Sequence, residues 1–221
     1  MLNIKRLVCN PLQENCYVVS DDSRECVIID CGAFYPEELD ALDGYIRDNQ
    51  LTPVHLLATH GHLDHNFGNA HVYRRYGLQV ELCGEDRQLV EHLPEQASAL
   101  FGITITDEQP PVGRQLSDGD TVTFGSHQLR VLRTPGHSHG SCLFHCPAES
   151  TVFTGDTLFR MSIGRTDFAE GSWAEMEHSL STVVALLPPD TVVLAGHGSQ
   201  TTIADELRYN PLLQSIPRGG R

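Results

Sequence analysis

The stretch that decides the fold reads Thr59-His60-Gly61-His62-Leu63-Asp64-His65, and it follows the largely apolar run 54–58. A short apolar run is typical of a buried strand, so the polar cluster begins where a strand gives way to a loop. His60, His62 and Asp64 alternate, and in an extended backbone their side chains share one face. His65 turns the other way or starts the next helix. One short segment therefore offers two differently directed sets of ligands at a strand end, where open α/β folds place their chemistry.

Three later segments put the same residue types after predicted strands. His137 closes the segment 134–137, Asp156 closes 154–156, and His197 lies within 194–198. Each has a neighbouring glycine, which lets the backbone of another segment come close. A lone His-X-His is most simply a solvated polar loop, but four strand-end segments of this kind indicate a metal site.

The chemistry of these side chains narrows the choice of metal. Imidazoles and carboxylates without thiolates suit zinc, iron or manganese, and zinc is the expected metal. The candidate ligands are more than one tetrahedral ion needs, so we predict two divalent ions on His60, His62, Asp64, His65, His137, Asp156 and His197. Two ions about 3.5–4 Å apart can hold a water between them, and zinc lowers the pKa of a bound water to about 7. This predicts hydrolysis by a metal-bridging hydroxide, without a side-chain nucleophile.

Composition excludes several other classes of protein. The chain has 221 residues, of which 40% are hydrophobic and 20% charged, in the range of an ordinary globular domain. Its net charge of −14 would repel a nucleic acid, and no basic run exceeds two residues, as in Arg74-Arg75. No stretch approaches the roughly 20 apolar residues of a membrane span. Residues 1–6 lead into a strand pattern rather than a signal peptide, so we expect a cytoplasmic protein that binds neither nucleic acid nor membrane.

Hydrophobic patterning predicts an α/β protein. Helical spacing or helix signals mark 36–49, 66–76 ended by Gly77, two short helices between 84 and 102, and 172–187 capped by Ser172. Strand patterns mark 16–19, 26–29, 53–58, 80–82, 120–124, 128–132, 141–146, 151–154 and 190–194. Two β-rich halves, each with helices, favour sheets packed face to face with helices outside. The seven scattered cysteines are expected to be reduced and buried.

These motifs, in this order, resemble the metallo-β-lactamase fold over nearly the whole chain. The segments 155–159 and 164–165, with Gly196-His197-Gly198 and the later Asn210-Pro211, are similar to glyoxalase II, the hydroxyacylglutathione hydrolase family, in its shorter bacterial form. The resemblance implies a four-layer αββα sandwich with a binuclear site at one edge. It also implies a single domain over 1–221, with only a remnant of the C-terminal helical region of longer glyoxalase II proteins.

The resemblance also implies roles for individual residues. One metal would bind His60, His62 and His137, the other would bind Asp64, His65 and His197, and Asp156 would bridge both. Asp64 and Asp156 would be catalytic, and Arg165 would contact the substrate, where longer glyoxalases hold the carboxylate of the thiol carrier. His139 stands where the family usually has proline, and we expect it to be a bystander.

The expected activity is hydrolysis of a small-molecule thioester, S-D-lactoylglutathione or a related acyl-thiol. The alternative is a persulfide dioxygenase of the same fold, with which the chain shares the segment 164–168; its single iron would use His60, His137 and Asp156. β-Lactam hydrolysis and metal binding without turnover are further hypotheses. The number of bound metals separates the first two activities.

Overall fold

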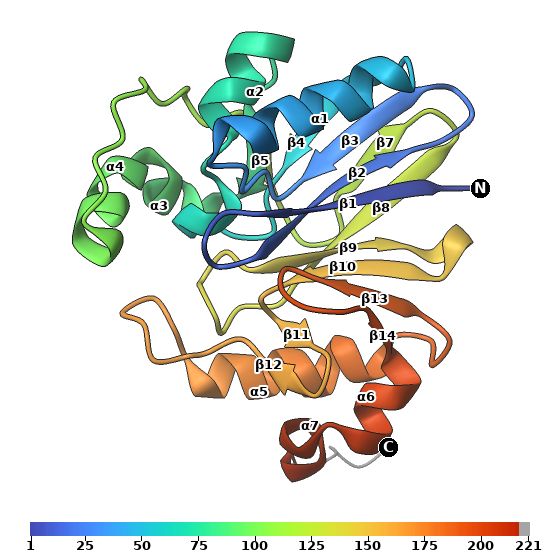
Figure 1. Cartoon of the computed structure of the whole chain (residues 1–221). Coiled ribbons are helices and arrows are strands. Elements are labelled where there is room, and N and C mark those ends of the chain that lie inside the picture. Colours follow the sequence, from blue (N-terminus) through green and yellow to red (C-terminus); the bar gives the residue numbers. More distant parts are fainter. Residues whose placement is uncertain (217–221) are drawn as a thin grey trace.

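The structure, a computed structural model, describes residues 1–216. The last residues of the predicted 1–221 domain, 217–221, lie outside this described part. Two sheets lie face to face in the middle of the molecule, and helices cover their outer faces (Figure 1). This confirms the predicted αββα sandwich. No helix of the described part is long and apolar enough to cross a membrane.

The first sheet has six strands in sequence order, and α1 (Pro36–Asp48) and α2 (Asn69–Tyr76) cover its outer face (Figure 1). Its first three strands are antiparallel, whereas the third to the sixth run parallel. The strands are β1 (Asn3–Cys9), β2 (Glu14–Ser20), β3 (Glu25–Ile29), β4 (Thr52–Leu57), β5 (Val80–Cys83) and β6 (Gln115–Leu116).

The second sheet also has six strands, in the order β14-β13-β10-β9-β8-β7. They are β7 (Thr121–Phe124), β8 (His127–Arg133), β9 (Cys142–Cys146), β10 (Thr151–Gly155), β13 (Val192–Ala195) and β14 (Thr201–Thr202). Outside this sheet lie a small hairpin and the C-terminal helices: β11 (Leu158–Phe159), β12 (Ser162–Ile163), α5 (Trp173–Thr182), α6 (Ile203–Tyr209) and α7 (Pro211–Ser215). Two short helices, α3 (Arg87–Glu91) and α4 (Leu93–Gln96), follow β5 and lead into a π-helical turn, Ala97–Phe101.

Strand alternation explains why the central strands of both sheets are buried on both faces. In β3, Val27 and Ile29 face the other sheet, while Ile28 packs toward the helices with Leu42 of α1. β10 behaves likewise, because Phe153 joins the core between the sheets and neighbouring residues face the other way. A strand buried on both faces reads as a continuous apolar run, which is the pattern found in the sequence.

Two helices are shorter than the sequence predicts. The predicted helix 66–76 begins only at Asn69, because the Asn66 side chain donates hydrogen bonds to the carbonyls of His60 (3.0 Å) and His62 (2.7 Å). These bonds hold a 3-10 turn, Leu63–His65, instead of an α-helical start. The helix predicted to end at 187 ends at Thr182 and continues as a 3-10 turn. Gly77, with φ of 74°, and Ser172, whose side chain accepts a bond from the Glu175 amide, end and begin their helices as predicted.

His127 ties β8 to two acidic side chains far from the metal-ligand candidates. Its Nδ1 lies 2.8 Å from Asp21 Oδ2, and its Nε2 lies 3.0 Å from Glu149 Oε1. Both ring nitrogens face carboxylates, which favours the doubly protonated, cationic form of the ring. The hydrogen bond to Asp21 raises the pKa of His127.

We expect His127→Gln to lower the free energy of unfolding by about 2 kcal/mol at pH 6 and by much less at pH 9. A raised folded-state pKa stabilises the protein fully below the unfolded value near 6.5, and this contribution is lost as pH rises through the folded value. Urea unfolding at both pH values measures the difference. The exposed His178→Gln is the control, and an equal loss at both pH values would contradict the prediction.

Candidate metal centre

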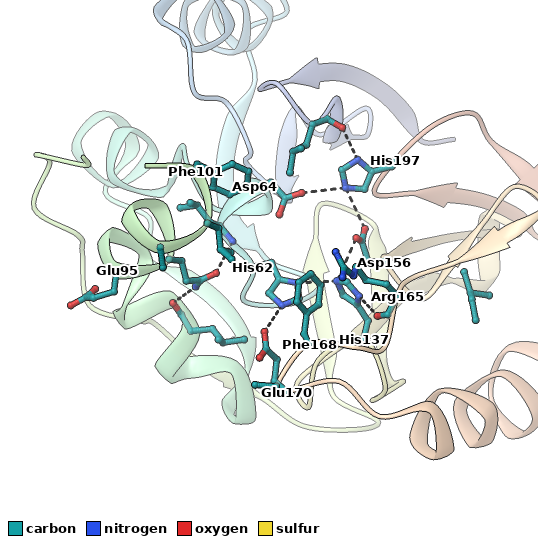
Figure 2. Close-up of a pocket in the computed structure, with 18 of the residues that line it drawn as sticks. His62, Asp64, Glu95, Phe101, His137, Asp156, Arg165, Phe168, Glu170 and His197 are labelled. Atoms are coloured by element: carbon teal, nitrogen blue, oxygen red, sulfur yellow. Dashed lines mark hydrogen bonds and ion pairs between the residues drawn. The ribbon is translucent and has the colours of Figure 1, made fainter. Parts of the chain in front are cut away.

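All seven predicted ligands come together at one edge of the sandwich. The loop after β4 supplies His60 and His62, and the 3-10 turn that follows supplies Asp64 and His65. The loops after β8, β10 and β13 supply the other three, which are His137, Asp156 and His197. Figure 2 shows His62, His137, Asp156 and His197 directed toward one another. Segments more than a hundred residues apart therefore meet at the ends of four strands.

Among the described residues, four groups of three possible ligand atoms lie close together, and two of these groups match the predicted sets of ligands. In the first group, one atom each from His60, His62 and His137 lie within 4.8 Å of one another. In the second, atoms of Asp64, His65 and His197 satisfy the same limit, with His197 Nε2 3.3 Å from Asp64 Oδ2. These are the two triads that the resemblance implies.

Asp156 lies between the groups, and its two carboxylate oxygens face different ones. Oδ2 is 3.4 Å from His137 Nε2, on the side of the first group. Oδ1 is 3.3 Å from His65 Nε2 and 3.6 Å from His197 Nε2, on the side of the second. The structure thus places Asp156 where a bridging carboxylate would be needed.

Hydrogen bonds on the outer side of three rings set which nitrogen faces the cluster. His137 Nδ1 donates to the Arg165 carbonyl at 2.8 Å, and His197 Nδ1 donates to the Leu12 carbonyl at 3.1 Å. Glu170 Oε1 accepts a hydrogen bond from His62 Nε2 at 2.8 Å. In each neutral ring the other nitrogen then carries a lone pair toward the centre, as a metal ligand requires.

The chemistry of the donors fits divalent metal ions. With the tautomers set by these outer bonds, His62 Nδ1 and His137 Nε2 present lone pairs to each other at 2.8 Å, an arrangement that a cation would relieve. The buried ring nitrogens His60 Nε2 and His65 Nε2 have no hydrogen-bond partner, and neither has Asp156 Oδ1. Unpartnered buried polar atoms are costly, and bound cations would satisfy all of them.

The pKa shifts within the cluster also favour the binding of divalent metal ions. Burial lowers the pKa of His60 well below its usual range, so this ring is neutral and keeps its lone pair. For His65, burial opposes the charged form, but Asp64, Asp156 and Asp30 outweigh it and raise the pKa. The pKa of Asp156 is lowered despite burial, chiefly by His65. The carboxylates of Asp156 and Asp64, whose pKa values are both lowered, are therefore ionised and require compensating positive charge at the site.

Two buried aspartates that the sequence analysis did not assign support the ligand loops. Asp30, which follows β3, accepts hydrogen bonds from the Thr59 amide (2.7 Å) and hydroxyl (2.8 Å), and its Oδ2 lies 3.1 Å from His65 Nδ1. Asp86, which follows β5, accepts bonds from the Gly61 amide (2.8 Å), the Ser138 hydroxyl (2.6 Å) and the Gly140 amide (2.6 Å). Asp86 thus joins the loop of His60 and His62 to the loop of His137. Both follow strands, so the pattern that located the ligands could also have found them.

A cavity of about 840 Å³ opens over the cluster. Five of the predicted ligands line it: His62, Asp64, His137, Asp156 and His197. Arg165 lines it as well, but its guanidinium makes two hydrogen bonds, of 2.6 and 2.7 Å, to Asp167. His139 is half exposed, faces Glu175 at 3.5 Å and is not among the lining residues, in keeping with a bystander role.

Glu170 is a positioning residue for His62 that the sequence analysis also missed. We expect Glu170→Ala to weaken metal binding about tenfold or more, because the His62 ring would lose the partner that fixes its tautomer and orientation. Competition with a chromophoric chelator measures the affinity, and the exposed Glu37→Ala is the control. Unchanged affinity in Glu170→Ala would show that the ring needs no such support.

Comparisons with known proteins agree with this geometry. Residues 9–197 match the family model of the metallo-beta-lactamase superfamily. Hydroxyacylglutathione hydrolase GloC of Haemophilus influenzae is 35% identical over 215 residues, which cover 97% of this chain and 99% of that protein. Among solved structures, BLEG-1 B3 metallo-beta-lactamase aligns with a TM-score of 0.88 at 35% identity, covering 96% of this chain and 100% of that one.

A second solved structure bears on the metals. TTHA1623 in a di-iron-bound form aligns with a TM-score of 0.83 at 36% identity, covering 95% of this chain and 100% of that one. The fold, the cluster of His and Asp side chains and the family match all agree with the resemblance seen in the sequence. This chain therefore belongs to the metallo-beta-lactamase superfamily and is a metallo-hydrolase.

Proposed function

We propose that this protein is a binuclear thioesterase that hydrolyses S-D-lactoylglutathione or a related acyl-thiol. The observation that carries the proposal is the placement of Asp156, whose two oxygens face two separate groups of ligand atoms. One ion would bind His60, His62 and His137, the other would bind Asp64, His65 and His197, and Asp156 would bridge them. Bound divalent ions, for which zinc is our first choice, would supply Lewis acidity and a water that ionises near neutral pH.

The cavity lining favours water as the nucleophile and a thiolate as the leaving group. None of the described lining residues is Ser, Thr, Cys or Lys, so the cavity offers no side-chain nucleophile of these types. Hydrolysis forms a bond between the water oxygen and the acyl carbon and breaks the carbon–sulfur bond. The sulfur departs as a thiolate, which needs no proton from the protein. Asp64, whose Oδ2 lies 3.3 Å from His197 Nε2, would orient the attacking water.

The wider setting supports a small-molecule substrate in a reducing compartment. All seven cysteines are buried and free, which suits the cytoplasm better than an oxidising space. The net charge of −14 argues against nucleic acid as a partner. Arg165 stays a predicted substrate contact, although it would have to exchange Asp167 for the substrate.

The test is hydrolysis of S-D-lactoylglutathione by metal-loaded protein, followed by loss of thioester absorbance, with metal counted per chain. Turnover with two ions bound, lost in His62→Ala, supports the thioesterase. One bound iron with oxygen-dependent persulfide oxidation would replace it with the dioxygenase alternative. That alternative uses His60, His137 and Asp156, and it leaves the grouping of Asp64, His65 and His197 without a role.

The second candidate function is β-lactam hydrolysis. The observation in its favour is the likeness to the B3 metallo-beta-lactamase BLEG-1. A strained lactam could be attacked by the same water in the same cavity. A chromogenic cephalosporin assayed beside the thioester decides between them, because the better substrate has the higher kcat/KM.

A further inference from the structure

The cavity over the cluster has an extensive apolar side. One part comes from the segment 87–101, which we call the helical arm, through Leu89, Leu100 and Phe101. Phe159 of β11 and Phe168 of a later loop also line the cavity. Phe168 packs against His62 and His137, with ring centroids 4.9 and 5.7 Å apart, and Figure 2 shows Phe101 on the side of Asp64. Apolar side chains therefore border the reacting centre on more than one side.

Several of these side chains are exposed, although large apolar residues are normally buried. Leu100 is 59% exposed and Leu12, which also lines the cavity, is 46% exposed. Phe101 is 39% exposed. Single exposed apolar side chains are common on protein surfaces. Several that line the same cavity indicate a ligand-binding surface.

The helical arm is fixed to the metal-ligand loop. Gln96 donates to the Gly61 carbonyl (3.2 Å) and to the Leu89 carbonyl (2.6 Å), and its Oε1 accepts from the Leu63 amide (3.2 Å). Gly61 and Leu63 flank His62 in the sequence. One amide side chain thus sets the position of the apolar surface relative to the ligands.

The charged side chains that line the cavity are poorly suited to bind a thiol that carries several carboxylates. Arg165 is the single Lys or Arg among the described lining residues, and Asp167 already occupies its guanidinium, which also stacks on Phe168 at 4.3 Å from the ring centre. Glu95 and Glu170 add negative charge to the lining. A substrate carboxylate placed here would have to displace Asp167 or lie near acidic side chains.

We propose that the apolar side of the cavity binds an aliphatic chain of the substrate, so that thioesters with an apolar chain are better substrates than matched thioesters without one. The chain could belong to the acyl group or to the thiol. This inference rests on the proposed thioesterase function and names its substrate class. Burial of the chain against Leu100, Phe101 and Phe168 would supply binding energy remote from the reacting carbonyl.

The test compares two series of thioesters hydrolysed by the metal-loaded protein. One series varies the acyl group from acetyl to hexanoyl on N-acetylcysteamine, and the other varies the thiol from ethanethiol to hexanethiol with a constant acetyl group. A fully buried methylene is worth about fourfold, so a partly buried four-methylene extension should raise kcat/KM by at least about tenfold in one series. The series that responds identifies which side of the ester carries the chain. Values of kcat/KM independent of chain length in both series would overturn the inference.

A variant pair links the preference to the helical arm. Leu100→Ser should lower the ratio of hexanoyl to acetyl kcat/KM about threefold or more, and Phe101→Ser should act in the same direction. Leu186→Ser is the matched control, because Leu186 is 78% exposed and is not among the cavity residues. A ratio that falls equally in all three variants, or in none, would contradict a role for the arm.

A binding measurement separates this inference from the proposed function. Calorimetry on metal-loaded protein should show hexanoate or hexanethiol binding about tenfold more tightly than acetate or ethanethiol, respectively, with the preference reduced in Leu100→Ser. If this preference holds but no thioester is hydrolysed, the apolar subsite stands and the thioesterase is wrong. If thioesters are hydrolysed without any chain preference in rate or binding, the thioesterase stands and the subsite is wrong.

Discussion

Replacing Asp156 with alanine should lower kcat/KM by at least about a thousandfold and reduce the bound metal from two ions per chain to one or none. Asp156 Oδ2 faces His137 and Oδ1 faces His65 and His197, so one substitution removes a ligand from both groups. The remaining imidazoles and Asp64 would also lose the ionised carboxylate that offsets the charge of the metals.

The measurement combines elemental analysis of metal per chain with thioester hydrolysis under saturating metal. Asp190→Ala is the control, because Asp190 is exposed and makes only a 3.4 Å hydrogen bond with Ser150. Two tightly bound ions in Asp156→Ala would show that Asp156 is not the bridge. Metal retained with activity lost would instead assign Asp156 a role in the reaction alone.

The second large effect is expected at Asp86, which touches no predicted ligand side chain. We expect Asp86→Ala to lower the free energy of unfolding by about 3–5 kcal/mol, because three buried donors would lose their acceptor. These donors belong to Gly61, Ser138 and Gly140, which lie in two different ligand loops. The same change should weaken metal binding about tenfold to a hundredfold, since the loops would no longer be held together.

Chemical unfolding of the metal-free protein gives the first quantity and chelator competition gives the second. Asp22→Ala, in an exposed turn, should change the free energy of unfolding by no more than about 0.5 kcal/mol. If Asp86→Ala does not fold, Asp86→Asn keeps the volume and removes the charge, and it should show the same losses to a smaller degree. A stability loss below about 1 kcal/mol in either variant would mean that the donors find other partners.

The elements that the sequence predicted well are those that carry a local signal. The helix 36–49 and the strands at 26–29 and 151–154 appear within a residue or two of their predicted bounds, because apolar periodicity reports directly on burial. The helix 66–76 was predicted too long, because the side chain of Asn66 bonds back to the ligand loop. Such a side-chain bond has no periodic signature.

The sequence by itself was enough to predict the fold family and to identify the seven candidate metal ligands. It could do so because each candidate follows an apolar strand, and strand ends meet at one edge of a sandwich. His60, His62 and Asp64 also share a single segment, so their spacing alone predicts a common face. The match to the metallo-beta-lactamase superfamily and the αββα layers agree with these predictions.

Only the tertiary structure decided what surrounds those ligands. Glu170 reaches His62 across 108 positions, and Asp86 reaches Gly140 across 54, so no local pattern could pair them. The structure also shows that the Arg165 guanidinium donates a hydrogen bond to Asp167. It shows as well that Leu100 and Phe101 line the cavity. The candidate metal ligands can be predicted from their residue type and from their position after a strand, and both can be read in the sequence. Ligand support and substrate preference depend on which distant side chains the fold brings within a few ångströms.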